Sequence, residues 1–109
     1  MDKKYRLLKN HHFKYLISEG KNVSNGQFFI YYMNREDFGT IRVGVSVGKK
    51  LVRFAFARNK IKRQVRTMLS DIKKDWAVDI VVMVRKKYLS NTYEENLSSL
   101  LHLLMKIPL

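Results

Sequence analysis

The sequence contains no cysteine among its 109 residues. This absence excludes disulfides, thiolate metal sites and a cysteine nucleophile, and it suits a reducing cytoplasm. No apolar run approaches the roughly 20 residues of a membrane helix, and the first residues, MDKKYRLLKNHHF, hold no apolar run of signal-peptide length. We therefore expect a cytoplasmic protein with no membrane partner.

Acidic residues are scarce as well, with 9 Asp and Glu against 22 Lys and Arg, which gives a formal net charge of +13. Such an excess opposes compaction unless a polyanion relieves it. Without a membrane signal, that polyanion is better explained as nucleic acid than as lipid. The hydrophobic content of 46% and the length of one ordinary domain predict that residues 1–109 form a single folded domain, and the charge suggests that this domain binds nucleic acid.

The first half of the chain predicts one helix and two strands. Asn10 can cap a short helix that Gly20 ends. Strand patterns follow at Gln27 to Met33 and at Thr40 to Gly48, and the turn residues NREDFG between them predict a β-hairpin. In the second strand, Ile41, Val43, Val45 and Val47 share one face, and the opposite face is small and polar.

The second half predicts a helix, a strand and a helix. Helical periodicity covers Phe54 to Ile72, and the apolar run Trp76 to Val84 is typical of a buried strand. Thr92 and Glu95 form a capping box that opens the last helix. The apolar stripe expected along that helix consists of Leu97, Leu100, Leu101, Leu104 and Met105.

The order α, β, β, α, β, α defines the expected fold class. The strand–helix–strand passage from Thr40 to Val84 predicts a crossover between parallel strands, added to the antiparallel hairpin in one mixed sheet. We therefore predict an α/β (α+β) fold, a two-layer α-β sandwich with a βαβ crossover.

The stretch FAFARNKIKRQVR, Phe54 to Arg66, contains five Lys or Arg and no acid. On a helical wheel, Ile61 and Val65 belong to the buried stripe, so the cations occupy the outer face together. A run of charge on a helix is commonly only a solvated face. Here the single sign and the charge of the whole chain favour a phosphate-binding surface, because guanidinium and amide groups suit phosphates and sugar hydroxyls.

The segments RVGVSVGKK, Arg42 to Lys50, and RNKIKRQVR, Arg58 to Arg66, resemble the protein-subunit family of bacterial ribonuclease P. The resemblance extends to RLLKNHHF, VSNGQFFIYY and DIVVMVRK, and so covers nearly the whole chain. It implies a ribosomal-protein-S5-domain-2-like fold with a left-handed crossover, against the usual right-handed rule.

The resemblance also implies a function. In the family, the RNA subunit uses Mg2+ to hydrolyse precursor tRNA at the mature 5′ end, and the protein binds RNA without catalytic side chains. The implied partners are the ribonuclease P RNA subunit and precursor tRNA, with no small-molecule substrate and no cofactor held by the protein. The residues implied at the RNA subunit are Arg58, Asn59, Lys60, Lys62, Arg63 and Arg66.

A second implied site is a cleft between the first helix and the sheet, which would hold the single-stranded 5′ leader of precursor tRNA. The residues implied there are Phe13, Ile17, Tyr31, Ser46, Lys49 and Lys50. Aromatic rings stack on unpaired bases and lysines neutralise phosphates, so these residue types suit such a ligand. On pattern alone, Phe13 and Tyr31 also fit an ordinary core.

Three positions depart from the usual family pattern. Lys60 stands where a second arginine is common, Ile17 where a second cleft aromatic is common, and Gly26 where an arginine often precedes the glutamine. Lysine keeps the positive charge but loses the bidentate guanidinium fork.

Two other functions remain open from the residues. The charge equally permits a generic ribosomal-type RNA-binding protein. Asp71, Asp75 and Asp79 raise the hypothesis of a metal-dependent nuclease, although solvation or capping explains aspartates at these positions better. His11, His12 and His102 show no metal-ligand spacing, and Ser46 has no nearby histidine and base pattern for nucleophilic catalysis.

Overall fold

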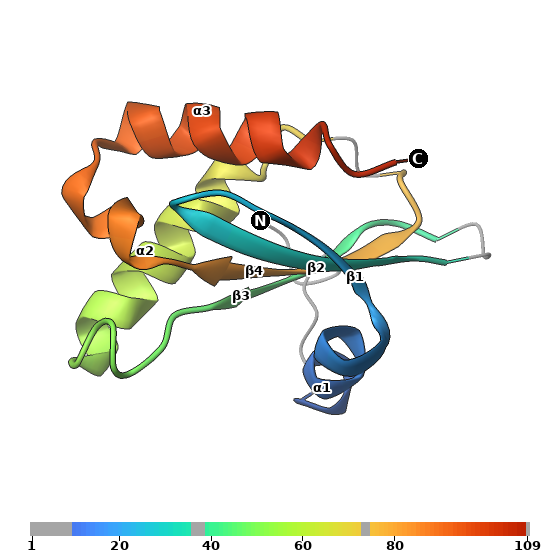
Figure 1. The fold of residues 1–109 in the computed structure, drawn as a ribbon, viewed down its shortest axis with the longest axis horizontal. Coiled ribbons are helices and arrows are strands. Elements are labelled where there is room, and N and C mark those ends of the chain that lie inside the picture. Colours follow the sequence, from blue (N-terminus) through green and yellow to red (C-terminus); the bar gives the residue numbers. More distant parts are fainter. Residues whose placement is uncertain (1–9, 36–38, 73–74, 109) are drawn as a thin grey trace.

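A four-stranded mixed sheet lies between the helices of this computed structural model, which describes residues 10–35, 39–72 and 75–108. The strand order is β1-β2-β4-β3. The strands are β1 (Lys21–Ser24), β2 (Phe28–Asn34), β3 (Arg42–Ser46) and β4 (Val78–Val84). The helices are α1 (Asn10–Glu19), α2 (Ala55–Met68), α3 (Tyr93–Leu104) and the short 3-10 helix η2 (Lys86–Ser90). Figure 1 shows the sheet nearly edge-on, with α3 on one side and α1 on the other.

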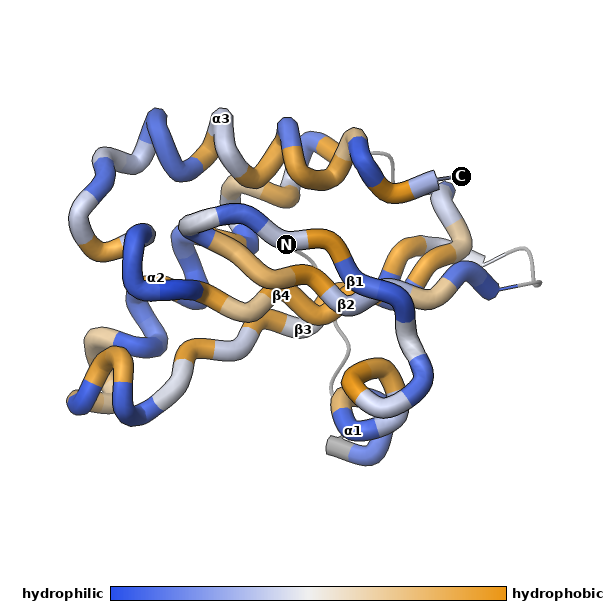
Figure 2. The backbone as a smooth tube through the Cα atoms, viewed as in Figure 1, coloured by the Kyte–Doolittle hydropathy of each residue, from blue (hydrophilic) through white to orange (hydrophobic). Residues whose placement is uncertain are grey.

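The sheet carries apolar side chains on both faces, because the residues of each strand alternate between the two sides. Ile30 of β2, Val45 of β3 and Ile80 of β4 belong to the main core under α2 and α3. On the opposite face, Val81 packs with Leu16 of α1 in a smaller cluster. Figure 2 shows hydrophobic residues concentrated along the strands. α1 therefore covers a second, separate core.

The predicted crossover between parallel strands is confirmed. β3 and β4 pair in parallel, from Arg42 opposite Asp79 to Ser46 opposite Met83, and α2 connects them. The mixed sheet and the α+β class are confirmed with it. The crossover helix packs on the face of the sheet that holds the main core, through Ile61, Val65 and Met68.

The predicted hairpin between residues 27–33 and 40–48 is wrong. β4 lies between β2 and β3, and it pairs antiparallel with β2. The hairpin partner of β2 is β1, a strand that the sequence analysis did not predict because it is polar and mostly exposed. Its turn is fixed by Asn25, whose Oδ1 accepts hydrogen bonds from the backbone N–H groups of Gln27 and Phe28.

The predicted helix boundaries hold with one shortening. α1 ends before Gly20, as expected, and α2 ends at Met68 rather than at Ile72. The capping box of α3 is confirmed, since the Thr92 hydroxyl accepts from the Glu95 backbone N–H and the Glu95 carboxylate accepts from the Thr92 N–H. These bonds hold the pKa of Glu95 below its usual value.

The apolar stripe predicted for α3 is partly wrong. Leu100 and Leu104 are buried, but Leu101 is 40% exposed and Met105 is 83% exposed. The buried side of this segment follows the positions Asn96, Leu100, Leu103, Leu104 and Ile107. Spacings of four, three, one and three residues place these side chains on one face of this segment. This face includes the polar residue Asn96, which a search for an apolar stripe could not reveal.

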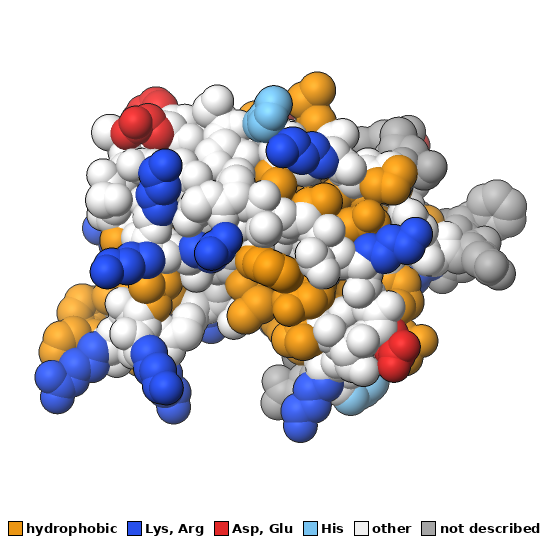
Figure 3. Space-filling model, viewed as in Figure 1, with side chains coloured by type: hydrophobic (Ala, Val, Ile, Leu, Met, Phe, Trp, Pro, Cys, Tyr) orange, Lys and Arg blue, Asp and Glu red, His pale blue; other side chains and the backbone are white. Residues whose placement is uncertain are grey.

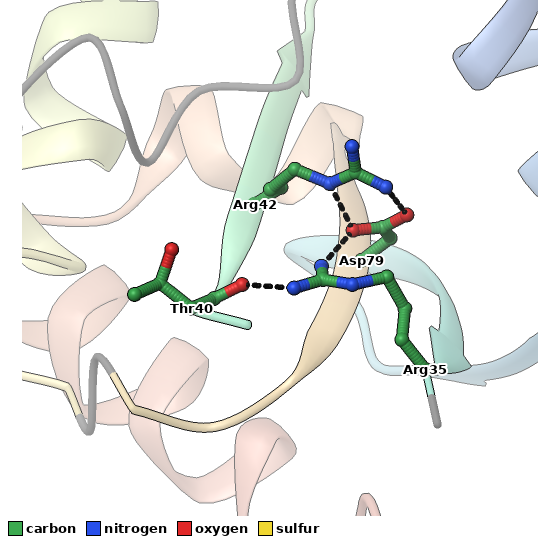
Figure 4. Close-up of polar contacts among 4 residues, drawn as sticks. All are labelled: Arg35, Thr40, Arg42 and Asp79. Atoms are coloured by element: carbon green, nitrogen blue, oxygen red, sulfur yellow. Dashed lines mark hydrogen bonds and ion pairs between the residues drawn. The ribbon is translucent and has the colours of Figure 1, made fainter. Parts of the chain in front are cut away.

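A cluster of three charged side chains ties the ends of three strands together (Figure 4). Arg42 of β3 binds Asp79 of β4 through two hydrogen bonds, of 2.7 Å from Nε and 2.6 Å from Nη2. Arg35, which follows β2, donates to the same carboxylate and to the Thr40 carbonyl oxygen. The side chain of Asp79 is only 12% exposed, so water screens these pairs weakly.

Replacing Asp79 with Asn should lower the free energy of unfolding by about 3 kcal/mol, because it removes the buried charge that both guanidinium groups contact. Asp75→Asn is the matched control, since it makes the same change of charge at an exposed aspartate in the connection that precedes β4. That variant should change stability by less than about 0.5 kcal/mol. Urea denaturation measures both, and equal unfolding midpoints would contradict the role given to Asp79.

Candidate nucleic-acid interface

The outer surface of α2 carries its polar and basic side chains because the opposite side is anchored in the core. Val65 is fully buried and Ile61 is 9% exposed, so the orientation of the helix about its axis is fixed. Asn59, Lys60 and Arg63 are exposed. No acidic residue occurs in the helix. The structure thus exposes three of the six residues predicted to contact the RNA subunit.

The other three predicted residues of α2, Arg58, Lys62 and Arg66, are partly covered. They flank the buried stripe at a spacing of four residues, so part of each side chain lies against the body of the protein. Arg58 also has a structural contact, since its Nη1 donates to the carbonyl oxygens of Val52 at 2.9 Å and Arg53 at 2.8 Å. The residue before the helix, Phe54, makes no capping hydrogen bond with its side chain. Arg58 therefore fixes the segment that leads into α2.

On the opposite face of the sheet, the Phe13 ring lies directly on Gly44 of β3. A Cβ atom at Gly44 would fall far inside the van der Waals contact distance of the ring. Phe13 and Tyr31 both pack against the cluster of Leu16 and Val81, and both remain partly exposed. Each of these two rings thus packs on one side and presents another side to solvent, so its packing in the core leaves surface that a ligand could contact.

The remaining predicted leader residues lie around the same face. Ser46 ends β3 and is half-buried, and Lys49 and Lys50 are exposed in the turn that follows. Ile17 of α1 is 44% exposed. Figure 3 shows the outline of the molecule hollowed below the sheet, between α1 and the segment that precedes α2, with Lys and Arg side chains on both sides.

Sequence reasoning missed three further features of the structure. Phe29 lies on the same sheet face as Tyr31, with its ring centroid 4.9 Å from that of Tyr31. Arg85, Lys86 and Lys87 are exposed where β4 leads into η2. The run of three cations was visible in the sequence, but its position beside the elements of the main core depends on the strand order. The sequence marked Gly44 only as part of a small, polar strand face, because its contact requires a ring from a distant helix.

The three aspartates do not form a common site. Asp71 and Asp75 are exposed in the connection between α2 and β4, whereas Asp79 is held by two guanidinium groups. Within residues 10–35, 39–72 and 75–108, no three His, Asp or Glu side chains lie close enough together to hold a metal ion. In the same ranges, no helix has the length and apolar character needed to cross a membrane.

The fold and this surface define a class, the small basic α+β proteins with a parallel βαβ crossover whose helix is cationic. A family model described as Ribonuclease P matches residues 1–108. A ribonuclease P protein component from Bacillus cereus is 39% identical over 104 residues, which cover 94% of this chain and 90% of the relative.

Two solved structures agree with this match. The ribonuclease P protein of Staphylococcus aureus superposes with a TM-score of 0.81 at 37% identity and covers 94% of each chain. The protein from Thermotoga maritima gives a TM-score of 0.81 at 31% identity and covers 94% of this chain and 97% of its own. The chain belongs to the ribonuclease P protein component family. It is thus the protein component of an endoribonuclease that acts in tRNA 5′ processing.

Replacing Gly44 with Ala should lower the free energy of unfolding by roughly 1–3 kcal/mol, because the added methyl group must displace the Phe13 ring from the sheet. Gly48→Ala is the control, since a Cβ there meets no atom within 4 Å. In a Phe13→Ala background, the cost of Gly44→Ala should nearly vanish. Chemical denaturation of the double-mutant cycle measures this coupling, and the same cost in both backgrounds would contradict the contact.

Proposed function

We propose that the chain binds the RNA subunit of ribonuclease P through α2 and the 5′ leader of precursor tRNA through the sheet face that α1 partly covers. The observation that carries the proposal is the outer surface of α2, where exposed cations stand on a helix without any acid. The residues proposed to contact the RNA subunit are Arg58, Asn59, Lys60, Lys62, Arg63 and Arg66.

The chemistry of these side chains suits an RNA backbone. A guanidinium group such as that of Arg63 can donate two parallel hydrogen bonds to a phosphate, and the Lys60 ammonium adds a compact charge. The Asn59 amide can both donate to and accept from a ribose hydroxyl. Because Ile61 and Val65 fix the helix in the core, these groups keep their spacing before any ligand binds.

The leader site uses a different kind of contact. Phe13 and Tyr31 offer partly exposed rings on which unpaired bases can stack, whatever their identity. Ser46, at the end of β3, and Lys49 and Lys50, in the turn that follows, can contact the leader backbone. Ile17 adds apolar surface. This segment continues directly into α2. The leader site and the RNA-subunit site are therefore joined along the chain, so that one bound protein can contact both.

Catalysis in this proposal belongs to the RNA subunit, which holds the Mg2+ ions. The proposed protein contacts are donors, cations and rings, and none of them is a general base or a nucleophile. No cofactor and no small-molecule substrate is assigned to the protein. Its place is the bacterial cytoplasm, where precursor tRNA is processed.

The purified protein should not cleave precursor tRNA by itself, and it should restore cleavage by the cognate RNA subunit at a magnesium concentration at which the RNA alone is slow. The measurement is a cleavage assay with protein-only and RNA-only controls. Stimulation should be larger for a substrate with a long 5′ leader than for one with a single leader nucleotide. A generic ribosomal-type RNA-binding protein predicts no dependence on the leader, and a lack of stimulation would refute the proposal.

Replacing Lys60 and Arg63 with Ala should weaken binding of the RNA subunit and flatten its dependence on salt. Each lost phosphate contact should reduce the slope of log affinity against log salt by roughly 0.7–0.9. Lys106→Ala removes another exposed cation, beyond the end of α3, and should leave the slope unchanged. Filter binding at several salt concentrations gives the slopes. Equal slopes for the double variant and the wild type would exclude α2 as the contact.

A further inference from the structure

A pocket of about 400 Å³ opens between α2 and the segment formed by η2 and the start of α3. This volume lies at the lower end of the range of ligand pockets, which is roughly 300–1,000 Å³. The pocket adjoins the cationic surface of α2, because Lys60 lines it. It lies among the elements that cover the main core, whereas the proposed leader site lies on the opposite face of the sheet.

Two of the three amide side chains that line the pocket, Gln64 and Asn96, have orientations fixed by hydrogen bonds. The Tyr88 hydroxyl donates to Gln64 Oε1 at 2.8 Å, which leaves the Gln64 Nε2 group as a donor. Burial raises the pKa of Tyr88 to about 12, so the hydroxyl keeps its proton and this orientation at physiological pH. Asn96, only 2% exposed, donates from Nδ2 to the Tyr88 carbonyl oxygen at 3.0 Å.

The fixed orientation of Asn96 leaves its Oδ1 without a partner in the part of the chain that the structure describes. A buried acceptor in this state carries an unmet desolvation cost, which a donor reaching it directly or through one water would relieve. Gln64 thus offers a donor at the pocket, and Asn96, which also lines the pocket, keeps a buried acceptor that a small movement of its side chain would expose. The Watson–Crick edge of a nucleobase likewise places a donor beside an acceptor.

The other lining residues of the pocket offer apolar surface and positive charge. Phe56 is 75% exposed, Leu89 is 49% exposed and Tyr93 is 38% exposed, although each is a large apolar side chain. Exposed rings beside cations are the arrangement with which proteins hold unpaired bases. The positive charge around the pocket favours an anionic ligand. Leu89 lines this pocket together with Lys60, and it lines a neighbouring pocket together with the cations 85–87. A ligand with a phosphate fits this surface better than an uncharged apolar peptide.

We infer that this pocket binds one unpaired nucleotide of the RNA that α2 contacts. Its base would lie against Phe56 and Tyr93, with its polar edge toward Gln64 and Asn96, and Lys60 would contact its phosphate. The inference rests on the proposed function, because it assumes that RNA lies along α2. The pocket would add a contact to a base, whereas the α2 contacts proposed above are contacts to the RNA backbone.

The test compares two exposed phenylalanines. Phe56 lines the pocket, whereas Phe54 does not, and their rings are stacked with centroids 5.7 Å apart. Phe56→Ala should lower the affinity for the RNA subunit by about 5- to 100-fold, the loss typical of one stacked base. Phe54→Ala should lower that affinity less than about threefold. Filter binding with the full RNA subunit measures both, and circular dichroism verifies that both variants are folded.

A second measurement addresses the pocket without the RNA subunit. Adenosine monophosphate added to ¹⁵N-labelled protein should shift the side-chain amide signals of Gln64 and Asn96, and Phe56→Ala should abolish these shifts while Phe54→Ala retains them. Adenosine should produce the same shifts at higher concentration. Inorganic phosphate should leave both amides unchanged, and if it reproduces the shifts, the pocket is only an anion site and the inference is wrong.

The outcomes separate the inference from the proposed function. If the wild type binds the RNA subunit and the two phenylalanine variants bind it equally well, the pocket inference fails and the proposed function stands. If the wild type does not bind the RNA subunit, the proposed function fails. Amide shifts with adenosine monophosphate, together with equal RNA affinities of the two variants, would identify a site for a free nucleotide and overturn the assignment to RNA.

Discussion

β4 needs apolar cover on both of its faces, and the arrangement of the other elements follows from this requirement. Val78, Ile80 and Val82 belong to the main core, and Val81 belongs to the cluster under α1. Because such a strand would expose apolar surface at an edge, it lies in the centre, with β2 and β3 beside it. α2 and α3 cover one face and α1 covers part of the other. The part of the second face that α1 leaves uncovered includes the partly exposed ring of Tyr31.

The cationic surface of α2 depends on the same core. Burying Ile61, Val65 and Met68 contributes roughly 1.5–3 kcal/mol for each side chain. Like charges four residues apart on a helix cost only a few tenths of a kcal/mol for each pair. Burial therefore exceeds repulsion, and the helix forms although its cations repel one another. The protein can hold its positive charges at fixed spacing before RNA arrives, so less ordering is needed on binding.

The sequence predicted the features that depend on neighbouring residues and missed those that depend on distant ones. The capping box of Thr92 and Glu95 and the exposed cations Lys60 and Arg63 of α2 follow from local patterns, and both are present in the structure. Strand pairing is not local, so β2 was assigned to β3 although β4 lies between them. The two arginines on Asp79 come from positions 44 and 37 residues away, which no spacing rule could connect. The contact of Phe13 with Gly44 has the same origin.

Backbone contacts alone leave one problem for a protein that must position RNA. Every nucleotide carries a phosphate, so a row of cations attracts many registers of the strand about equally, and proteins held by charge alone can slide. A pocket that binds one base favours a single register over the others, because unpaired bases are few in a folded RNA and each has a fixed position in the RNA structure. The pocket beside Lys60 lies where such a contact would set the register of α2. Charge then supplies most of the affinity, and one directional contact selects the position.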